Sequence, residues 1–380
     1  MHHASATTRT QRYAGEDRIV MMLIAKAPMR ISFGGDGTDL PAYCERNGGL
    51  VVSTSIGYSF YTLLNTAPGD GVQILSADHR TLSLSASRQD LILDEGLQLP
   101  SSIIDFFDPR SGLTVFLASE VPAGSGLGVC GALTISMIKG LSFWCGIDLE
   151  PAATADIACQ IQIDGLGMPV GRQDQYAAAF GGLNRIRFSS DGVSVEPLRL
   201  PPGTEVALQE SLMLFFTGVS RSSSSILHQL RQSISDGDGE VLSRLGAIKD
   251  LTSEIGDALE QDNLPLFGEL LHRAWVEKRH LVEGITNPFI DQCYQTARDH
   301  GAGGGKISGA GGGGFLILYC VKERQDDVTE ALRELGVQRW PLALDHQGVQ
   351  LMQATPWQRL SSDTIRWDGA RPERQRLRSL

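Results

Sequence analysis

Residues 122–132 form a short segment with four glycines among the eight residues 124–131. The segment follows an apolar run at residues 113–118 and precedes an apolar, helix-like pattern that ends near Trp144. Glycine lets the backbone adopt left-handed conformations and approach a ligand closely. A helix starting near Gly131 would point its free N–H groups and its positive dipole end into the loop. This order therefore predicts a strand, an anion-binding loop and a helix, an arrangement suited to phosphate.

A second glycine-rich segment, residues 301–314, has nine glycines in fourteen residues and runs directly into the apolar stretch 315–321. A flexible linker of this composition would usually continue into polar sequence. We therefore interpret the segment as backbone that must approach a ligand or another loop closely. Residues 27–40 contain a further cluster of glycines, and we expect the three segments to belong to one site.

The pattern of apolar residues predicts an α+β fold in both halves of the chain, because strands and helices do not alternate as in a doubly wound sheet. The predicted strands are residues 20–25, 29–33, 50–55, 59–64, 72–76, 81–85, 113–118, 183–188, 193–198, 212–217 and 315–321. The predicted helices are residues 131–144, 151–163, 222–235, 240–261, 265–282 and 288–300. Pro201-Pro202-Gly203 is the predicted domain boundary. The predicted parts are a flexible leader (1–19), an N-terminal domain (20–200), a C-terminal domain (204–345) and a C-terminal extension (346–380).

The composition excludes some classes of function. A net charge of −11 over 380 residues argues against general binding to nucleic acid or to an anionic membrane. The six cysteines are scattered without zinc-type spacing, which is typical of reduced thiols in the cytoplasm. No apolar run is long enough to span a bilayer, and the polar first twenty residues do not resemble a signal peptide. We therefore expect a cytoplasmic globular protein, whose oligomeric state the sequence leaves open.

Six segments in order resemble the GHMP superfamily of small-molecule kinases, and among these most of all the D-glycero-D-manno-heptose 7-phosphate kinases. They are residues 27–39, 122–132, 171–182, 217–224, 271–275 and 304–315, and the likeness spans about residues 20–345. The resemblance implies a ribosomal-S5-like N-terminal domain, a ferredoxin-like C-terminal domain and a site between them. It also implies ATP as phosphoryl donor, Mg²⁺ as metal ion and a sugar phosphate as acceptor, phosphorylated on its anomeric hydroxyl.

The resemblance also assigns roles to residues. Asp174 matches the presumed catalytic base, which accepts the proton of the attacking hydroxyl, and Arg30 lies where relatives place a basic residue beside that carboxylate. The predicted ATP-binding residues are Pro122, Gly124, Ser125, Gly126, Leu127, Gly128, Val129, Cys130, Gly131 and Ala132. The predicted substrate-binding residues are Gly35, Thr38, Asp39, Gln173, Tyr176, Ser220, Arg221, Gly311 and Gly312.

Several of these residues also have an ordinary structural interpretation. Asp39 could be a turn residue or helix cap before Pro41, and Ser220 with Arg221 could be a helix N-cap followed by a solvated arginine. We weigh the cap and a sugar-phosphate site at Ser220 and Arg221 equally. Lys278 and Arg279 are weaker candidates for the same phosphate, because charged residues on helices usually face water.

The sequence departs from the family at the positions that bind the metal. Relatives have serines where this chain has Val129 and Cys130, and a glutamate where it has Gln162. Magnesium favours carboxylate and hydroxyl oxygens over sulfur. Two alternatives to a heptose phosphate kinase therefore stay open. One is a degenerate homologue that binds a ligand or partner without transferring phosphate, and the other is a kinase for a cyclitol phosphate.

Overall fold

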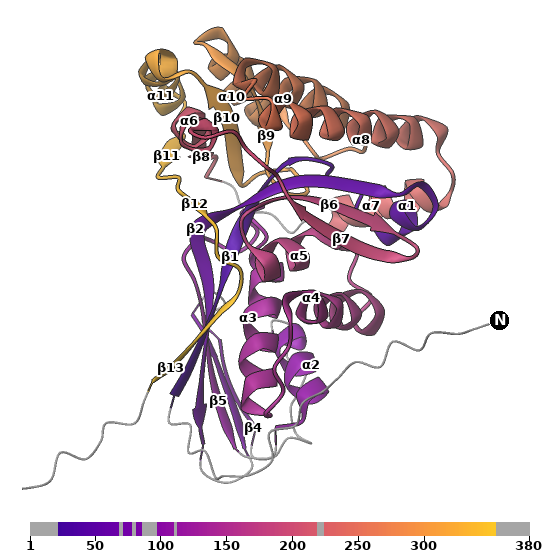
Figure 1. Ribbon diagram of the computed structural model, residues 1–380, viewed down its shortest axis with the longest axis vertical. Helices are drawn as coiled ribbons and strands as arrows, with labels where there is room; N and C mark the ends of the chain where they lie inside the picture. Colours follow the sequence, from indigo (N-terminus) through magenta and orange to yellow (C-terminus); the bar gives the residue numbers. More distant parts are fainter. Residues whose placement is uncertain are drawn as a thin grey trace, which may run out of the picture.

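The computed structural model describes residues 22–67, 71–77, 81–85, 97–109, 112–218 and 224–354 of the chain. It contains mixed strands and helices, as the α+β prediction requires (Figure 1). The strands are β1 (Met22–Gly34), β2 (Gly49–Thr66), β3 (Val72–Ser76), β4 (Thr81–Ser85), β5 (Leu113–Ser119), β6 (Leu183–Ser189), β7 (Gly192–Pro197), β8 (Leu212–Phe216), β9 (Ala302–Ile307), β10 (Phe315–Cys320), β11 (Gln338–Trp340), β12 (Leu344–Asp345) and β13 (Gln350–Ala354). The helices are α1 (Pro41–Asn47), α2 (Gln98–Phe107), α3 (Val129–Trp144), α4 (Pro151–Cys159), α5 (Gln173–Phe180), α6 (Thr204–Ser211), α7 (Ser224–Ser235), α8 (Gly239–Glu260), α9 (Leu264–Lys278), α10 (Pro288–Asp299) and α11 (Gln325–Glu334). A π-helical turn (Gln160–Gly165) extends α4, and a short 3₁₀ turn (Lys322–Arg324) precedes α11.

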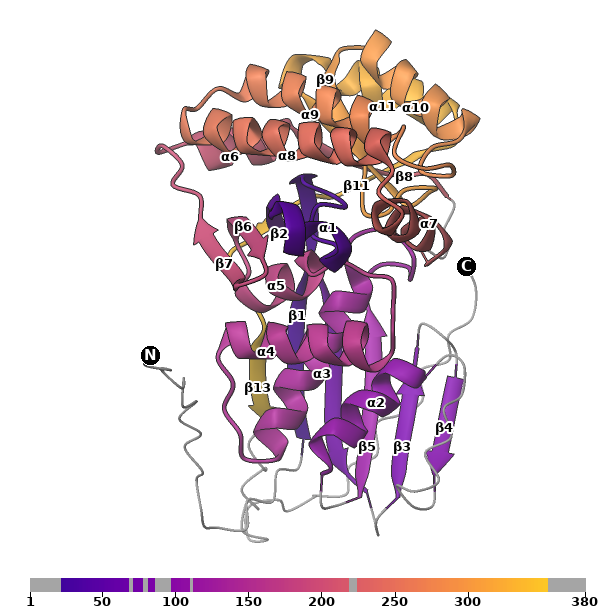
Figure 2. The same ribbon diagram turned by 90° about the vertical axis from the view of Figure 1, so that its right-hand side faces the viewer.

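The first sheet is built around the long strands β1 and β2. Its strand order is β13-β1-β2-β5-β3-β4. Strands β6 and β12 pair with other parts of β2, and β7 pairs with β6. All of these pairs are antiparallel except β3 with β5, which is parallel. Helices α2, α3 and α4 lie against one face of this sheet (Figure 2). The sheet can therefore bury alternate side chains of each strand beneath those helices.

The second sheet is antiparallel, with strand order β11-β8-β10-β9. Every residue of β10 is buried, which is typical of a central strand covered on both faces. Helices α8 and α9 run side by side across this half of the molecule and lie over the end of the first sheet (Figures 1 and 2).

The two sheets share one apolar core at their junction. Phe33 of β1 packs edge to face against Phe267 of α9, with ring centroids 5.1 Å apart. The same cluster of buried residues includes Leu214 of β8, Ile255 of α8 and Phe315 of β10. The two halves are therefore held against each other by buried apolar surface, and the loops at the junction are fixed by it.

The C-terminal residues return to the first sheet. Strand β12 pairs with the middle of β2, and β13 pairs with β1 in the register Met22↔Ala354 to Lys26↔Gln350. The predicted domain limits stay a prediction, but residues 344–354 belong by their pairing to the N-terminal sheet. The leader (1–19) and residues 355–380 lie outside the described residues. None of the helices that the structure describes is long and apolar enough to cross a bilayer.

Some elements differ from the sequence prediction. The two strands predicted at 20–25 and 29–33 form the single strand β1, with a register shift between Pro28 and Met29. Proline cannot donate a backbone hydrogen bond, so pairing becomes irregular there without ending the strand. The glycine segment 301–314 contains strand β9, which the sequence analysis did not predict. Strands are predicted from alternating apolar and polar side chains, and glycine has no side chain to show that pattern.

Candidate functional site

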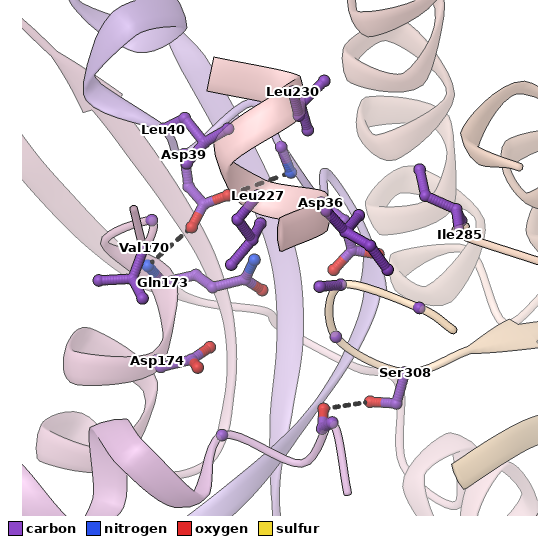
Figure 3. Close-up of a pocket in the computed structure, with 18 of the residues that line it drawn as sticks. Asp36, Asp39, Leu40, Val170, Gln173, Asp174, Leu227, Leu230, Ile285 and Ser308 are labelled. Atoms are coloured by element: carbon purple, nitrogen blue, oxygen red, sulfur yellow. Dashed lines mark hydrogen bonds between the residues drawn. The ribbon is translucent and has the colours of Figure 1, made fainter. Parts of the chain in front are cut away.

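A pocket lies between the two halves of the molecule, and Figure 3 shows residues that line it. It has an empty volume of about 1070 Å³, including its opening to solvent. It is lined by strand β1 and the β1–α1 loop, the glycine loop with the start of α3, the start of α5 with the residues just before it, helix α7, the end of α9 with the loop after it, and the turn after β9. The three glycine-containing segments that the sequence pointed to are therefore brought together in one place.

Arg30 and Asp174 form an ion pair at one side of this pocket. Arg30 Nε donates to Asp174 Oδ1 at 2.8 Å, and its second terminal nitrogen lies 2.6 Å from the same oxygen. The remaining terminal nitrogen donates to the carbonyl of Gly126 at 2.7 Å. Arg30 is almost fully buried on β1, so its guanidinium has one fixed position. The pair links strand β1, helix α5 and the glycine loop.

Asp39 is a buried carboxylate on the same side of the pocket. Oδ1 accepts a hydrogen bond from the Gly37 N–H at 3.2 Å, and Oδ2 accepts one from the Gln173 N–H at 3.1 Å. Burial raises the pKa of Asp39 to about 6; the Gln173 hydrogen bond opposes this shift and the charge of Asp174 adds to it. Figure 3 shows Gln173 between the carboxylates of Asp39 and Asp174. The pocket therefore presents the carboxylates of Asp39 and Asp174 on the same side, with Gln173 between them.

The glycine loop leads into α3 with its backbone facing the pocket. Gly128 is the N-cap of α3 with φ +80°, a conformation that favours glycine. A Cβ on Gly131 would lie 2.5 Å from Asp174 Cβ, so the absence of a side chain lets α3 and α5 approach closely. Of the ten predicted nucleotide-binding residues, Gly124, Gly126, Gly128, Val129 and Cys130 line the pocket. Pro122, Ser125, Leu127, Gly131 and Ala132 are not part of its lining.

The turn after β9 closes the pocket from the second sheet. Ser308 Oγ donates to the Gly126 carbonyl at 2.8 Å, which joins this turn to the first glycine loop (Figure 3). Gly311 lines the pocket, whereas Gly312 is not part of the lining and donates its N–H to the carbonyl of the lining residue Ile285. The predicted close approach of the second glycine segment to another loop is found here.

Three predicted substrate residues face other parts of the structure. Thr38 is fully buried, and its hydroxyl bonds the backbone of Gly35 and Leu50. Gly35 packs on the same backbone, because a Cβ there would lie 1.9 Å from the Leu50 carbonyl oxygen. The Tyr176 hydroxyl bonds Asp156 and borders a separate, smaller cavity. Ser220 and Arg221 lie outside the described residues.

Cys130 and Gln162 occupy the positions of the expected metal ligands. The two side chains are hydrogen-bonded to each other. The amide of Gln162 is engaged on one side by Cys130 Sγ at 3.3 Å and on the other side by Gln175. Burial raises the pKa of Cys130 to about 12, so the thiol keeps its proton at neutral pH. All six cysteines are free thiols.

Sequence reasoning missed one charged cluster at this site. Asp36 of the β1–α1 loop forms ion pairs with Lys278 of α9 and Lys306 of β9. The expectation that Lys278 faces water is wrong: the residue is 4 % exposed. The sequence did contain a sign of this cluster, because a charged residue interrupts each of two glycine segments: Asp36 in one and Lys306 in the other. Pairing them requires knowing that the two segments meet.

Comparison with known proteins places these features in a family. Residues 98–182 match the model described as the GHMP kinases N-terminal domain, and residues 257–338 match the GHMP kinases C-terminal model. The chain is 30 % identical over 316 residues to a D-glycero-alpha-D-manno-heptose 7-phosphate kinase of Campylobacter jejuni, covering 81 % of this chain and 92 % of that protein.

Solved structures agree on the fold. A D-glycero-D-manno-heptose 1-phosphate kinase from Bacteroides thetaiotaomicron superposes with a TM-score of 0.73 at 24 % identity, over 88 % of this chain and 100 % of that one. A Lactococcus lactis galactokinase complexed with galactose gives a TM-score of 0.70 at 17 % identity, over 88 % and 95 %. One of the two family models matches in each half of the chain. The chain belongs to the GHMP kinase family.

Proposed function

We propose that this protein transfers the γ-phosphoryl group of ATP to a hydroxyl of a sugar phosphate, with D-glycero-D-manno-heptose 7-phosphate as the first candidate acceptor. The supporting observation is the convergence, in one pocket, of the Arg30–Asp174 ion pair with the glycine loop at the N-terminus of α3. The curated relative that phosphorylates this heptose covers most of the chain, which supports the choice of acceptor.

Asp174 is the proposed catalytic residue. Its carboxylate would accept the proton of the acceptor hydroxyl while that oxygen bonds the γ-phosphorus and the bond to the ADP oxygen breaks. Arg30 makes both of its contacts to Oδ1, so it orients the carboxylate, and its positive charge lies beside the developing charge of the transferred group. Asp39, held by two backbone N–H groups, would accept a hydrogen bond from another acceptor hydroxyl.

The proposed triphosphate site is the glycine loop. Gly124, Gly126 and Gly128 line the pocket in front of α3, and a sixteen-residue helix directs free N–H groups and a partial positive charge toward it. This chemistry suits a polyanion such as ATP. The Ser308 hydrogen bond to Gly126 would hold the loop in the shape that the phosphates meet.

The residues at the expected metal positions do not fit magnesium. Cys130 offers a protonated thiol, and Gln162 offers only a neutral amide that is already hydrogen-bonded to Cys130 and Gln175, so neither supplies the carboxylate or hydroxyl oxygen that magnesium favours. Among the described residues no group of three or more histidine, cysteine or acidic side chains could hold a metal ion. We therefore assign no step of the reaction to a protein-bound metal.

The direct test compares wild type with the Asp174→Asn variant, using ATP and D-glycero-D-manno-heptose 7-phosphate and measuring phosphorylated product. We expect kcat to fall by roughly 10²- to 10⁴-fold, because asparagine cannot accept the proton. Asp148→Asn is the matched control, since that side chain is 77 % exposed and pairs only with Lys139 in the contacts described. Asp174→Asn activity within twofold of wild type would exclude Asp174 as the base.

The apolar part of the pocket supports a second candidate acceptor, a cyclitol phosphate. Its lining includes the aliphatic side chains Leu40, Val170, Ile226, Leu227, Leu230, Leu281 and Ile285. A carbocycle replaces the ring oxygen of a sugar with a carbon, so it suits such a wall better. A panel of sugar and cyclitol phosphates, compared by kcat/KM, separates the two. ATP binding by calorimetry without turnover of any member of the panel would instead support a degenerate, ligand-binding homologue.

A further inference from the structure

Three uncharged side chains form a hydrogen-bonded chain between α3, the π-helical turn and α5. Cys130 lies in the first turn of α3, Gln162 in the π-helical turn and Gln175 on α5. The Gln162 amide is hydrogen-bonded to Cys130 Sγ at 3.3 Å and to the Gln175 amide. We call these three side chains the neutral bridge. Two of them, Cys130 and Gln162, occupy the positions of the expected metal ligands.

The neutral bridge is buried, and its polar groups are paired with one another. Gln162 and Gln175 are each 1 % exposed. Burial raises the pKa of the Cys130 thiol, and amides do not ionise, so all three groups are uncharged at neutral pH. The bridge can offer a cation a neutral amide oxygen but no carboxylate, which is the ligand that magnesium favours. These residues therefore bring no negative charge to the start of α3.

The acidic side chains in the described lining of the pocket are accompanied by basic ones. Asp174 is paired with Arg30, and Asp36 is paired with two buried lysines. The third carboxylate, Asp39, accepts hydrogen bonds from two backbone N–H groups. Three basic side chains thus accompany three carboxylates, so the described part of the pocket has no excess of acidic groups.

The glycine loop lies directly against the Arg30–Asp174 pair. A Cβ on Gly128 would lie 3.5 Å from Asp174 Cγ and 3.6 Å from Arg30 Cζ. The two charges of the pair offset each other. The free N–H groups and the positive end of α3 are therefore left to attract an anion at the loop.

The charge of the surrounding residues decides how strongly a nucleotide site depends on a metal ion. Carboxylates beside the phosphates repel metal-free ATP, and a divalent cation bound between them removes this repulsion. Nucleotide binding at such a site requires the metal. The neutral bridge exerts no repulsion of this kind, so the free anion loses little by binding without a cation.

We infer that this protein binds ATP as the metal-free anion about as tightly as it binds magnesium-ATP, because the neutral bridge places no carboxylate beside the phosphates. This inference rests on the proposed triphosphate site and deepens it by naming the ionic form of the ligand. Magnesium carried by the phosphates contributes little to affinity, since Cys130 and Gln162 give it no charged ligand.

The first measurement is the binding of ATP to the wild-type protein by calorimetry, without acceptor, in excess EDTA and in excess magnesium chloride. Both solutions have the same ionic strength, because salt screens the interactions between charges. We expect the two dissociation constants to agree within about threefold. Binding that is about tenfold or more tighter with magnesium would overturn the inference.

Gln162→Glu tests the bridge itself, because it replaces a neutral amide with a carboxylate on a side chain of the same length. We expect this variant to bind ATP about tenfold more weakly than wild type in EDTA and to regain affinity with magnesium. Gln160→Glu is the matched control, since Gln160 lies in the same π-helical turn but is exposed. The control should bind ATP as wild type does in both solutions.

Magnesium dependence in both variants alike would show that overall charge sets it, and magnesium dependence in neither would show that the bridge does not. Either result would overturn the inference. If Gln162→Glu does not fold, the wild-type comparison still decides.

The proposed function can fail separately from this inference. Equal ATP binding in the two solutions, without turnover of any acceptor, would support the inference and contradict phosphoryl transfer. Turnover together with strongly magnesium-dependent binding would support the proposed function and overturn the inference. If the folded protein binds ATP in neither solution, the proposed triphosphate site is wrong and the inference falls with it.

Discussion

At the scale of single residues, Asp39 shows that a pocket residue can lower the stability of the folded protein. Its carboxylate is 2 % exposed, and its pKa is raised from 3.8 to about 6, mainly by burial. Among the described residues, the backbone N–H groups of Gly37 and Gln173 donate hydrogen bonds to it and partly compensate the lost hydration. A buried carboxylate with a raised pKa in a pocket is a candidate functional group.

The raised pKa of Asp39 predicts a pH-dependent cost. Below about pH 4 the carboxyl is protonated in the folded and unfolded states alike. Between about pH 4 and 6 the unfolded chain releases the proton while the folded protein keeps it, so stability falls as pH rises, and the full cost is present above pH 6. We expect the difference in unfolding free energy, Asp39→Asn minus wild type, to increase by on the order of 2 kcal/mol from pH 4 to pH 7.

Urea unfolding of both proteins at the two pH values measures this difference. Because the stability difference between variant and wild type is compared at two pH values, any pH-independent effect of the substitution, such as a lost hydrogen bond, cancels. Asp148→Asn serves as the control for the substitution itself, because that side chain is 77 % exposed. An Asp39→Asn difference that does not change with pH would contradict the assigned shift.

At the scale of secondary-structure elements, the contact between α3 and α5 positions the Arg30–Asp174 pair. A Cβ on Gly131 would lie 2.5 Å from Asp174 Cβ and 2.9 Å from its carbonyl carbon, which is closer than such contacts allow. Gly131→Ala must therefore push α5 away. We expect a loss of about 1–3 kcal/mol in unfolding free energy and at least a tenfold fall in kcat.

Gly246→Ala is the matched control for this prediction. Gly246 also lies in a helix, α8, but a Cβ there would meet nothing within 4 Å. Alanine has the higher helix propensity, so this variant should gain up to about 1 kcal/mol and keep full activity. The unfolding free energy and kcat of both variants are measured by denaturant unfolding and steady-state kinetics. Equal kcat values for the two variants would show that the contact between α3 and α5 does not position Asp174.

At the scale of the whole molecule, the C-terminal strand β13 completes the first sheet. It covers the edge of β1 over five residue pairs, and Leu351 packs against the shared apolar core. An uncovered edge strand offers free N–H and C=O groups to other chains. Strand β13 thus covers the edge of β1, a strand more than 300 positions earlier in the chain.

Deletion of residues 350–380 should therefore cost at least about 2 kcal/mol of unfolding free energy, as for the loss of a packed leucine, and should promote aggregation. Deletion of residues 355–380 is the matched control, because it keeps β13. Denaturant unfolding and light scattering compare the two truncated proteins. If both behave alike, the pairing of β13 with β1 contributes nothing measurable to stability.

Elements with local signals could be predicted from the amino-acid pattern alone. Strands β3 and β4 have the predicted limits, and α3 begins two residues before its predicted start. Alternating or helical patterns of apolar side chains, bounded by turn residues, are enough for such elements, because each is set by its own neighbours in the chain. The glycine loop before α3 could be predicted for the same reason, and with it the family resemblance.

The tertiary structure decided which polar groups meet. Thr38 and Tyr176, expected at the substrate, use their hydroxyls elsewhere in the fold. Lys278, expected in water, is buried against Asp36, which lies 242 positions away in the chain. No local pattern encodes such a pair: the free energy of a buried charge depends on partners that only the packing of the two sheets supplies. The sequence could therefore indicate the loops of the site, while the packing determined which of their side chains face the pocket.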